Sequence, residues 1–132
     1  MNYAEAFQRL GYRLAAPRTD WSAANEDGVC LTLWKVELDP EYKRRRLDSR
    51  KNCGPIEEWP ARGKNLRHQH LSQAVDQHDG WVDVIIVHGT PGVGFGDADP
   101  WVVRDRKSRW RVVSFDRETG HFVVELVPTE GK

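Results

Sequence analysis

The sequence predicts an α+β fold in which a small, curved and mostly antiparallel sheet is accompanied by two helices. Three observations support this prediction. Segments with strand character dominate the chain, they do not alternate regularly with helical segments, and the last two are joined by a short hairpin linker. Regular alternation would instead predict a doubly wound parallel sheet. With 132 residues, the chain is expected to form a single domain, residues 1–132.

The first two elements are a helix and a strand. Residues 2–10 are expected to form a short helix, because Asn2 can cap it and Glu5 follows three residues later, as in a capping box. Residues 28–38 are rich in β-branched and apolar side chains and follow an Asp-Gly turn, which predicts a strand. Both faces of this strand are apolar as far as Trp34, so we expect it to be covered on both sides.

The middle of the chain combines a long loop with the second helix. Residues 39–63 show no periodic pattern and predict a loop or a set of short pieces. Residues 65–78 predict a helix that ends at an Asp-Gly pair. Its apolar stripe at helical spacing consists of Leu66, His70, Leu71, Ala74 and Val75.

The remaining segments are mainly strands. Residues 81–88 predict a buried strand, and residues 101–103 a short one. The glycine-rich stretch between them is expected to be a flexible turn; it is not a phosphate loop, because no Lys-Ser/Thr pair and no helix follow it. Residues 109–115 and 121–127 predict a hairpin whose linker, DRETG, ends in a glycine that can adopt the positive φ of the turn.

Composition narrows the function classes. The 20 basic residues balance the 20 acidic ones, so no overall charge points to a nucleic acid or a membrane. No apolar run is long enough for a transmembrane helix, and the N-terminal residues do not resemble a signal peptide, so a cytoplasmic protein without a membrane partner is expected. The two cysteines are expected to be reduced thiols, with Cys30 in the core.

Positive charge is nevertheless concentrated in one part of the chain. Between residues 41 and 67 there are nine lysines and arginines and four carboxylates. Arginine forks match phosphate groups, so this stretch could hold a nucleic-acid backbone. The alternative is a solvated loop whose charges pair with the acidic remainder of the chain. The candidate backbone contacts are Lys43, Arg44, Arg45, Arg46, Arg62 and Arg67.

Six tryptophans are a large number for this length, and they serve either a core or a binding site. Trp81 and Trp110 are expected in the core, since both fall in strands. Trp21 and Trp59 fall in polar loops. Each of them could either pack in the core or line the wall of a pocket. Trp21 and Trp34 bound one hairpin-like segment, and with the polar groups of Asp20, Ser22 and Asn25 they could form a slot for a planar heterocycle.

Catalytic and metal-binding patterns are not found. The sequence holds no nucleophile elbow and no cysteine with an evident base. Its histidines are not combined with cysteines at the spacing of a zinc site. We therefore predict no catalytic residue, no metal and no cofactor.

Four stretches together resemble a known superfamily. They are DWS at 20–22, LTLW at 31–34, GKNLRHQHL at 63–71 and the terminal hairpin at 109–127. In outline this arrangement is similar to the PUA-like superfamily, which includes the SRA, EVE, YTH and ASCH domains. The resemblance implies a pseudobarrel that binds nucleic acid and takes a base into an aromatic pocket. It also implies Trp21 and Trp34 as stacking residues, Asp20, Ser22 and Asn65 as readers of the base edge, and residues 44–46 as a backbone clamp.

The function predicted from these observations is a nucleic-acid-binding module, for DNA or RNA, that reads a flipped or modified base. A bacterial or phage protein with a companion nuclease domain or a protein partner would fit this function. Two alternatives stay open: a protein-interaction or accessory domain without catalysis, and a small hydrolase or nuclease.

Overall fold

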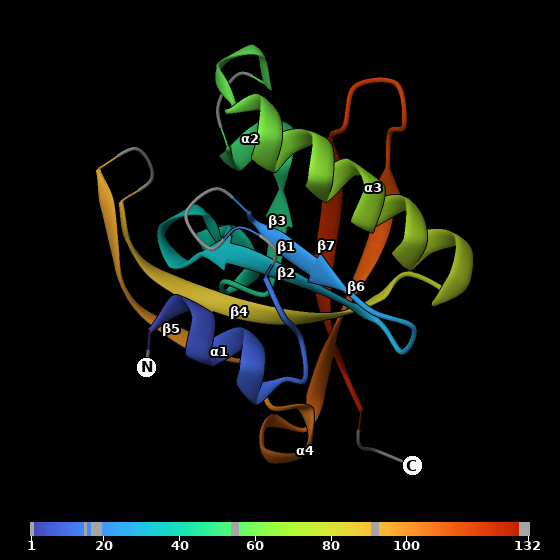
Figure 1. Ribbon diagram of the computed structural model, residues 1–132. Coiled ribbons are helices and arrows are strands. Elements are labelled where there is room, and N and C mark those ends of the chain that lie inside the picture. The colour runs from blue at the N-terminus through green and yellow to red at the C-terminus, as the bar shows by residue number, and fades with distance from the viewer. Residues whose placement is uncertain (1, 15, 17–19, 54–55, 91–92, 130–132) are drawn as a thin grey trace.

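The strands form one mixed sheet, and helices lie against both of its faces (Figure 1). The structure is a computed structural model that describes residues 2–14, 16, 20–53, 56–90 and 93–129. The helices are α1 (Tyr3–Arg9), α2 (Ser49–Asn52), α3 (Ala61–Gln77) and α4 (Val103–Arg106), with 3-10 turns η1 (Lys35–Glu37), η2 (Pro40–Tyr42) and η3 (Ile56–Glu58). The strands are β1 (Ser22–Ala24), β2 (Val29–Trp34), β3 (Arg46–Asp48), β4 (Trp81–Thr90), β5 (Gly94–Pro100), β6 (Ser108–Phe115) and β7 (Phe122–Pro128).

The order of the strands in the sheet is β1-β2-β4-β6-β7-β3. The long strand β4 pairs with two strands along the same edge. Its first two residues pair with β6, and its second half pairs with β5. Its other edge pairs with β2, and among the described strands this is the parallel pair. The edge strands β1 and β3 do not pair with each other within the described residues, so the sheet is open there. The predicted α+β fold with a mostly antiparallel sheet is confirmed. The sheet is not closed into a barrel within the described residues, and four helices accompany it instead of the two expected.

Two apolar cores lie on opposite faces of the sheet. On one face, Leu71 and Ala74 of α3 pack with Leu31 and Leu33 of β2. On the other face, Phe7 of α1 packs with side chains that include Cys30, which alternates with Leu31 along the strand. As predicted, β2 is therefore covered on both sides, and Cys30 lies in the core.

The predicted helices and the hairpin are confirmed, with one shifted boundary. Asn2 and Glu5 form the expected capping box at the start of α1. The second helix, α3, ends close to the predicted residue but starts four residues early, directly after Pro60. β6 and β7 form the hairpin, and Gly120 has the expected positive φ of +88°.

Four predictions about the strands are wrong. The strand expected at residues 28–38 ends at Trp34, and the 3-10 turn η1 follows it. The glycine-rich stretch contains an edge strand, β5, because it can pair with the exposed edge of β4. The strand expected at residues 101–103 is replaced by the start of α4. Trp81 is not a core residue: Trp110 is buried on the α3 side, but Trp81 lies on the opposite face and is partly exposed, between Arg109 and Arg111.

The expected long loop at residues 39–63 is organised around Asp39, which is almost fully buried. Its carboxylate accepts hydrogen bonds from the Glu41 backbone at 2.9 Å and from Lys51 Nζ at 2.9 Å. Its backbone carbonyl accepts from the amide of Arg44, whose φ of 61° is in the left-handed region. The described part of the stretch contains η2, β3, α2, η3 and the start of α3, and β3 pairs with β7. A periodic pattern could not have predicted these short pieces.

No helix within the described ranges is both long enough and apolar enough to cross a membrane.

Candidate functional site

Trp21 lies against α3, at the entrance to β1. Its backbone carbonyl accepts hydrogen bonds from the amide and the hydroxyl of Thr32, which fixes the chain at this point. Its indole packs directly on Gly63, where a Cβ atom would overlap the ring. A glycine at this position of α3 therefore allows the indole to approach the helix backbone closely.

Arg67 lies one helical turn after Gly63, and its guanidinium is surrounded by aromatic rings. Its Cζ atom lies 4.7 Å from the ring centre of Trp21, 4.9 Å from that of Trp59 and 4.8 Å from that of Phe122. We call Trp21, Trp59, Arg67 and Phe122 the Arg67 cluster. Cation–π contacts of this kind stabilise a guanidinium without using its N–H donors.

Among the described residues, the charge of Arg67 has no counter-ion in contact, and Glu37 acts on it only through space. Within the described residues, Arg67 makes neither a hydrogen bond nor an ion pair. The dense surroundings lower its pKa to about 10, chiefly by desolvation, so it stays charged at neutral pH. As a whole residue Arg67 is half-buried. Its N–H donors have no hydrogen-bond acceptor among the described residues.

Trp59 closes the cluster on the side of α2. Its indole N–H donates to the Cys53 carbonyl at 3.0 Å. Its ring meets the ring of Trp21 edge-on, with the centres 6.3 Å apart, and the ring of His121 at 5.6 Å. The position of Trp59 is thus fixed by one hydrogen bond and two ring contacts, as a stacking wall requires.

Two weakly acidic groups lie next to the Arg67 cluster. The Cys53 thiol donates to the Glu37 carboxylate at 3.5 Å. Burial raises the pKa of Glu37, against the lowering effects of this bond and of the charge of Arg67. Burial also raises the pKa of Cys53, so the thiol stays protonated and is a poor nucleophile. Glu37 and Arg67 place an acceptor and a donor group near the same rings.

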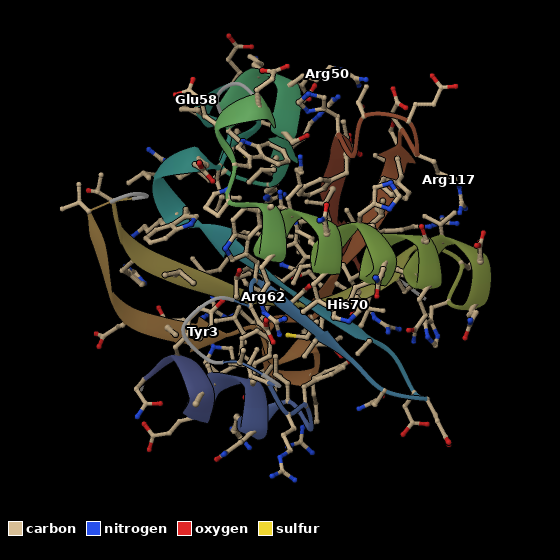
Figure 2. All side chains as sticks on the ribbon, turned by 45° about the horizontal axis from the view of Figure 1, so that its top comes forward. Tyr3, Arg50, Glu58, Arg62, His70 and Arg117 are labelled. Atoms are coloured by element: carbon tan, nitrogen blue, oxygen red, sulfur yellow. The ribbon has the colours of Figure 1, made fainter. Side chains whose placement is uncertain are left out.

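On the side of α1, the phenol of Tyr3 is near the same charge. Its hydroxyl donates to the Asp20 carbonyl at 2.7 Å. Burial raises the pKa of Tyr3 to about 12, while the hydrogen bond with Thr32 and the charge of Arg67 lower it. In the view of Figure 2, Tyr3, Arg62 and His70 lie near the centre, whereas Arg50, Glu58 and Arg117 lie toward the rim.

The predicted edge readers are placed in different surroundings. Asp20 is buried, and its carboxylate accepts from Arg62 Nε at 3.2 Å and from the backbone of Ala16 at 2.8 Å. Ser22 is buried and bonded to His70 Nδ1 at 2.6 Å. These polar groups already have protein partners. Asn65 is exposed on α3.

The two predicted stacking residues do not share one slot. Trp34 is partly exposed and packs against the core under α1. Trp21 packs against α3, which covers the other face of the sheet. The structure therefore brings Trp21 together with Trp59 and Arg67 instead of Trp34.

The predicted backbone contacts divide into two groups. Arg46 pairs with Glu125 at 3.3 Å, Arg62 pairs with Asp20, and Arg67 lies in its cluster. The other three are exposed on the turn before β3: Lys43, Arg44 and Arg45.

This exposed turn is attached to the segment that carries Glu37. Arg44 Nη1 donates to the carbonyls of Lys35 and Leu38, at the two ends of η1. The basic turn is thus held against η1, the segment that carries Glu37.

Sequence reasoning selected Trp21 and Arg67 but missed the central role of Arg67 and the presence of Glu37, Cys53 and Phe122. One available signal was the spacing of Gly63 and Arg67, which puts both on one face of a helix. The partners from η1 and β7 could not be identified, because they depend on how the strands are ordered.

Metal binding gains no support from the described residues, where no group of three or more His, Cys, Asp or Glu side chains could hold an ion. Comparison with protein-family models, with curated proteins and with solved structures finds no match to this chain.

Proposed function

We propose that the protein binds nucleic acid and takes one flipped or unpaired base, including a modified base, at the Arg67 cluster. The observation that carries this proposal is the guanidinium of Arg67, which is surrounded by rings and has no hydrogen-bond or ion-pair partner in contact among the described residues, on a residue that is half-buried. A planar ligand with acceptor atoms satisfies both features, because it stacks on a flat surface and accepts from the N–H donors.

The energetics favour a base. Stacking of a base on an aromatic side chain contributes about 1–3 kcal/mol. Extruding a base from a duplex costs a few kcal/mol, and less when the base is mismatched or already single-stranded. Hydrogen bonds from Arg67 and to Glu37 would add selectivity, since one donates and the other accepts.

The backbone next to that base would meet the exposed turn of Lys43, Arg44 and Arg45. Attachment of this turn to η1 through Arg44 supports its place beside the cluster. Lysine and arginine contacts to phosphate hold a nucleic acid in position without reading its sequence. Binding is then expected to weaken as the salt concentration rises.

The proposal includes membership of the PUA-like superfamily. A PUA-like relationship is supported by the α+β architecture and by the position of α3, which connects the parallel strands β2 and β4 and packs on the sheet beside them. A location in the cytoplasm and a companion nuclease or protein partner belong to the same proposal.

Fluorescence polarisation with labelled single-stranded DNA and RNA tests the proposal. Arg67→Met keeps a long side chain in the cluster but removes the charge and all five donors. We expect it to weaken binding at least tenfold, as for a lost charge-assisted hydrogen bond of about 1.5–3 kcal/mol. The same titrations with oligonucleotides that carry plain and modified bases identify the preferred base.

The matched control is Arg117→Met, which removes the same charge. Arg117 is exposed and pairs with Asp76 at the far end of α3. It should bind like the wild type, within the small effect of the net charge. Equal affinities of wild type and Arg67→Met would refute the base-reading role. Lack of binding to any oligonucleotide would favour the protein-interaction alternative.

A further inference from the structure

One row of side chains crosses four strands of the sheet. Arg46 of β3 is opposite Glu125 of β7, and Glu125 is also opposite Arg111 of β6. Arg111 is in turn opposite Trp81 of β4. Directly opposite residues lie on the same face of a sheet, so these four side chains form a continuous line across it. We call Arg46, Glu125, Arg111 and Trp81 the cross-strand row.

The cross-strand row lies on the face of the sheet that is turned away from α3. Leu47, Val82, Trp110 and Val124 each precede or follow a member of the row along a strand, and all four belong to the core under α3. Successive side chains of a strand point to opposite faces, so the row points away from that core. On this second face, the described members of the core under α1 include none from β3, β6 or β7. Figure 1 shows α1 beside β4 and β5, where it contacts both strands.

The row is open to solvent along its length, and its charges are balanced. The side chain of Arg46 is 27% exposed, those of Glu125 and Arg111 are each 39% exposed, and Trp81 is also partly exposed. Arg46 pairs with Glu125 at 3.3 Å, and Arg111 pairs with Asp79 at 3.0 Å. The row and Asp79 together carry no net charge. They offer no excess of cations to a phosphate backbone, which argues for a protein partner.

The charged members of the row keep groups that a partner can bind. Glu125 meets Arg46 through Oε2, and its Oε1 accepts no hydrogen bond from a described residue. Arg111 uses Nε and Nη2 toward Asp79, and its Nη1 donates to no described residue. One acceptor and one donor therefore remain unused on adjacent strands.

The order of the row is self-complementary. A two-fold rotation about an axis that runs along the strands, between β6 and β7, exchanges β6 with β7 and β4 with β3. Glu125 of each copy then faces Arg111 of the other copy, and Arg46 faces Trp81. The first contact joins opposite charges, and the second is a cation–π contact. Each contact occurs twice, as in an isologous interface.

We propose that the cross-strand row is the interface through which two copies of the chain form a dimer, packed sheet against sheet. Sheets that pack face to face keep their strand directions within about 30°, which a two-fold axis along the strands provides. The neighbouring row, in which Arg109 is opposite Val127, fits the same axis because it also brings no like charges together. Tryptophan and arginine are residue types that often dominate interface energies. The dimer does not depend on the proposed function, since the Arg67 cluster lies with Phe122 on the α3 side.

Sedimentation equilibrium tests the dimer, which is the expected state of the wild type. Glu125→Arg and Arg111→Glu each place like charges across the two-fold axis, so each variant alone should be monomeric at the same concentration. An equimolar mixture of the two should form dimers again, because each altered position then faces an opposite charge on the other chain. Mixing cannot repair a contact within one chain, so this rescue separates an interface from a cross-strand pair inside one sheet.

Glu118→Arg is the matched control, since it makes the same charge change at an exposed position of the linker between β6 and β7 and should stay dimeric. Trp81→Ala reverses no charge, so it tests the row even if the charge-reversal variants do not fold. It should weaken the dimer about tenfold through the loss of two cation–π contacts. A wild type that stays monomeric at about 1 mM, a concentration that populates even a weak dimer, would overturn the proposal. A mixture that stays monomeric, or dimers that persist unchanged in the row variants, would overturn it too.

Discussion

For Arg67, the contribution of the side-chain charge to stability differs most clearly from its proposed role in binding. A fall of its pKa from 12.5 to about 10 corresponds to roughly 3 kcal/mol against the charged form. Cation–π contacts with aromatic rings stabilise a desolvated cation by about 2 kcal/mol or more. The two effects oppose each other and are of similar size, so we expect the charge of Arg67 to contribute little to folding.

Arg62, on the same helix, is in the opposite situation. It pairs with the carboxylate of Asp20, which is almost fully buried. Removing one partner of a fully buried pair commonly costs about 3–5 kcal/mol. Because the Arg62 side chain is 56% exposed, we expect its removal to cost less than this, while it still leaves the buried carboxylate without its ion pair. The two arginines therefore form a matched pair for separating structural from functional charge.

Gly63 allows the first prediction at this scale. Alanine is favoured over glycine in a helix by about 1 kcal/mol, but its Cβ at position 63 would overlap the Trp21 indole. We expect Gly63→Ala to destabilise the protein by about 1–3 kcal/mol, as overpacking does. Urea unfolding measures the difference. Asn65→Ala, at an exposed position of α3, should change stability by no more than about 0.5 kcal/mol. Wild-type stability of Gly63→Ala would show that Trp21 is free to move away.

At the scale of elements, two histidines hold helices through buried serines. His70 of α3 bonds Ser22 of β1, and His121 bonds Ser49 of α2 at 2.9 Å. Ser49 Oγ also accepts from the Phe122 amide, which leaves its hydroxyl proton available to a neutral His121 Nδ1. Protonation of Nδ1 would reverse the direction of this bond.

These contacts predict loss of stability in mild acid. Desolvation lowers the pKa of His70, and desolvation with the charge of Arg50 lowers that of His121. The unfolded chain therefore binds more protons than the folded one once the pH falls below about 6.5, the ordinary pKa of histidine. Stability should be full above that pH and decline as the pH falls through the lowered folded pKa values.

Urea unfolding at pH 7.5 and pH 5.5, with His70→Gln/His121→Gln as the comparison, measures this effect. The variant should lose less stability between the two pH values than the wild type. The raised pKa of Glu37 acts in the opposite direction, but it is common to both proteins and cancels. Identical pH dependence of the two proteins would contradict the histidine account.

The elements could be predicted where side-chain periodicity alone determines them. The capping box of α1 and the hairpin of β6 and β7 are local features, and both are present. β5 was missed because its glycine-rich sequence forms a strand only through pairing with β4. The Arg67 cluster depends in the same way on contacts between η1, α3 and β7, which no local pattern encodes.

At the scale of the whole molecule, β4 is the centre of the fold. It pairs with β2 on one side and with β5 and β6 on the other, and α3 and α1 cover its two faces. Sequence patterns predicted this strand and its burial, but the order of strands around it follows from long-range packing. A parallel partner for β4 was not predicted, because strand direction leaves no mark in periodicity.

Hydrogen–deuterium exchange tests whether β4 is the most stable strand of the sheet. Amides of Val84, Ile85, Ile86 and Val87 are expected to exchange only through global unfolding, since both neighbours must separate first. The three-residue edge strand β3 should exchange much faster. Comparable protection of the two strands would indicate that β4 does not organise the sheet.

The central claim is that the charge of Arg67 serves a ligand more than the fold, and one paired measurement tests it most directly. Arg67→Met and Arg62→Met are unfolded in urea, and oligonucleotide affinity is measured on the same samples. We predict that Arg67→Met keeps or exceeds wild-type stability and loses binding, whereas Arg62→Met is destabilised. The opposite result, with Arg67→Met several kcal/mol less stable and its affinity unchanged, would contradict the account.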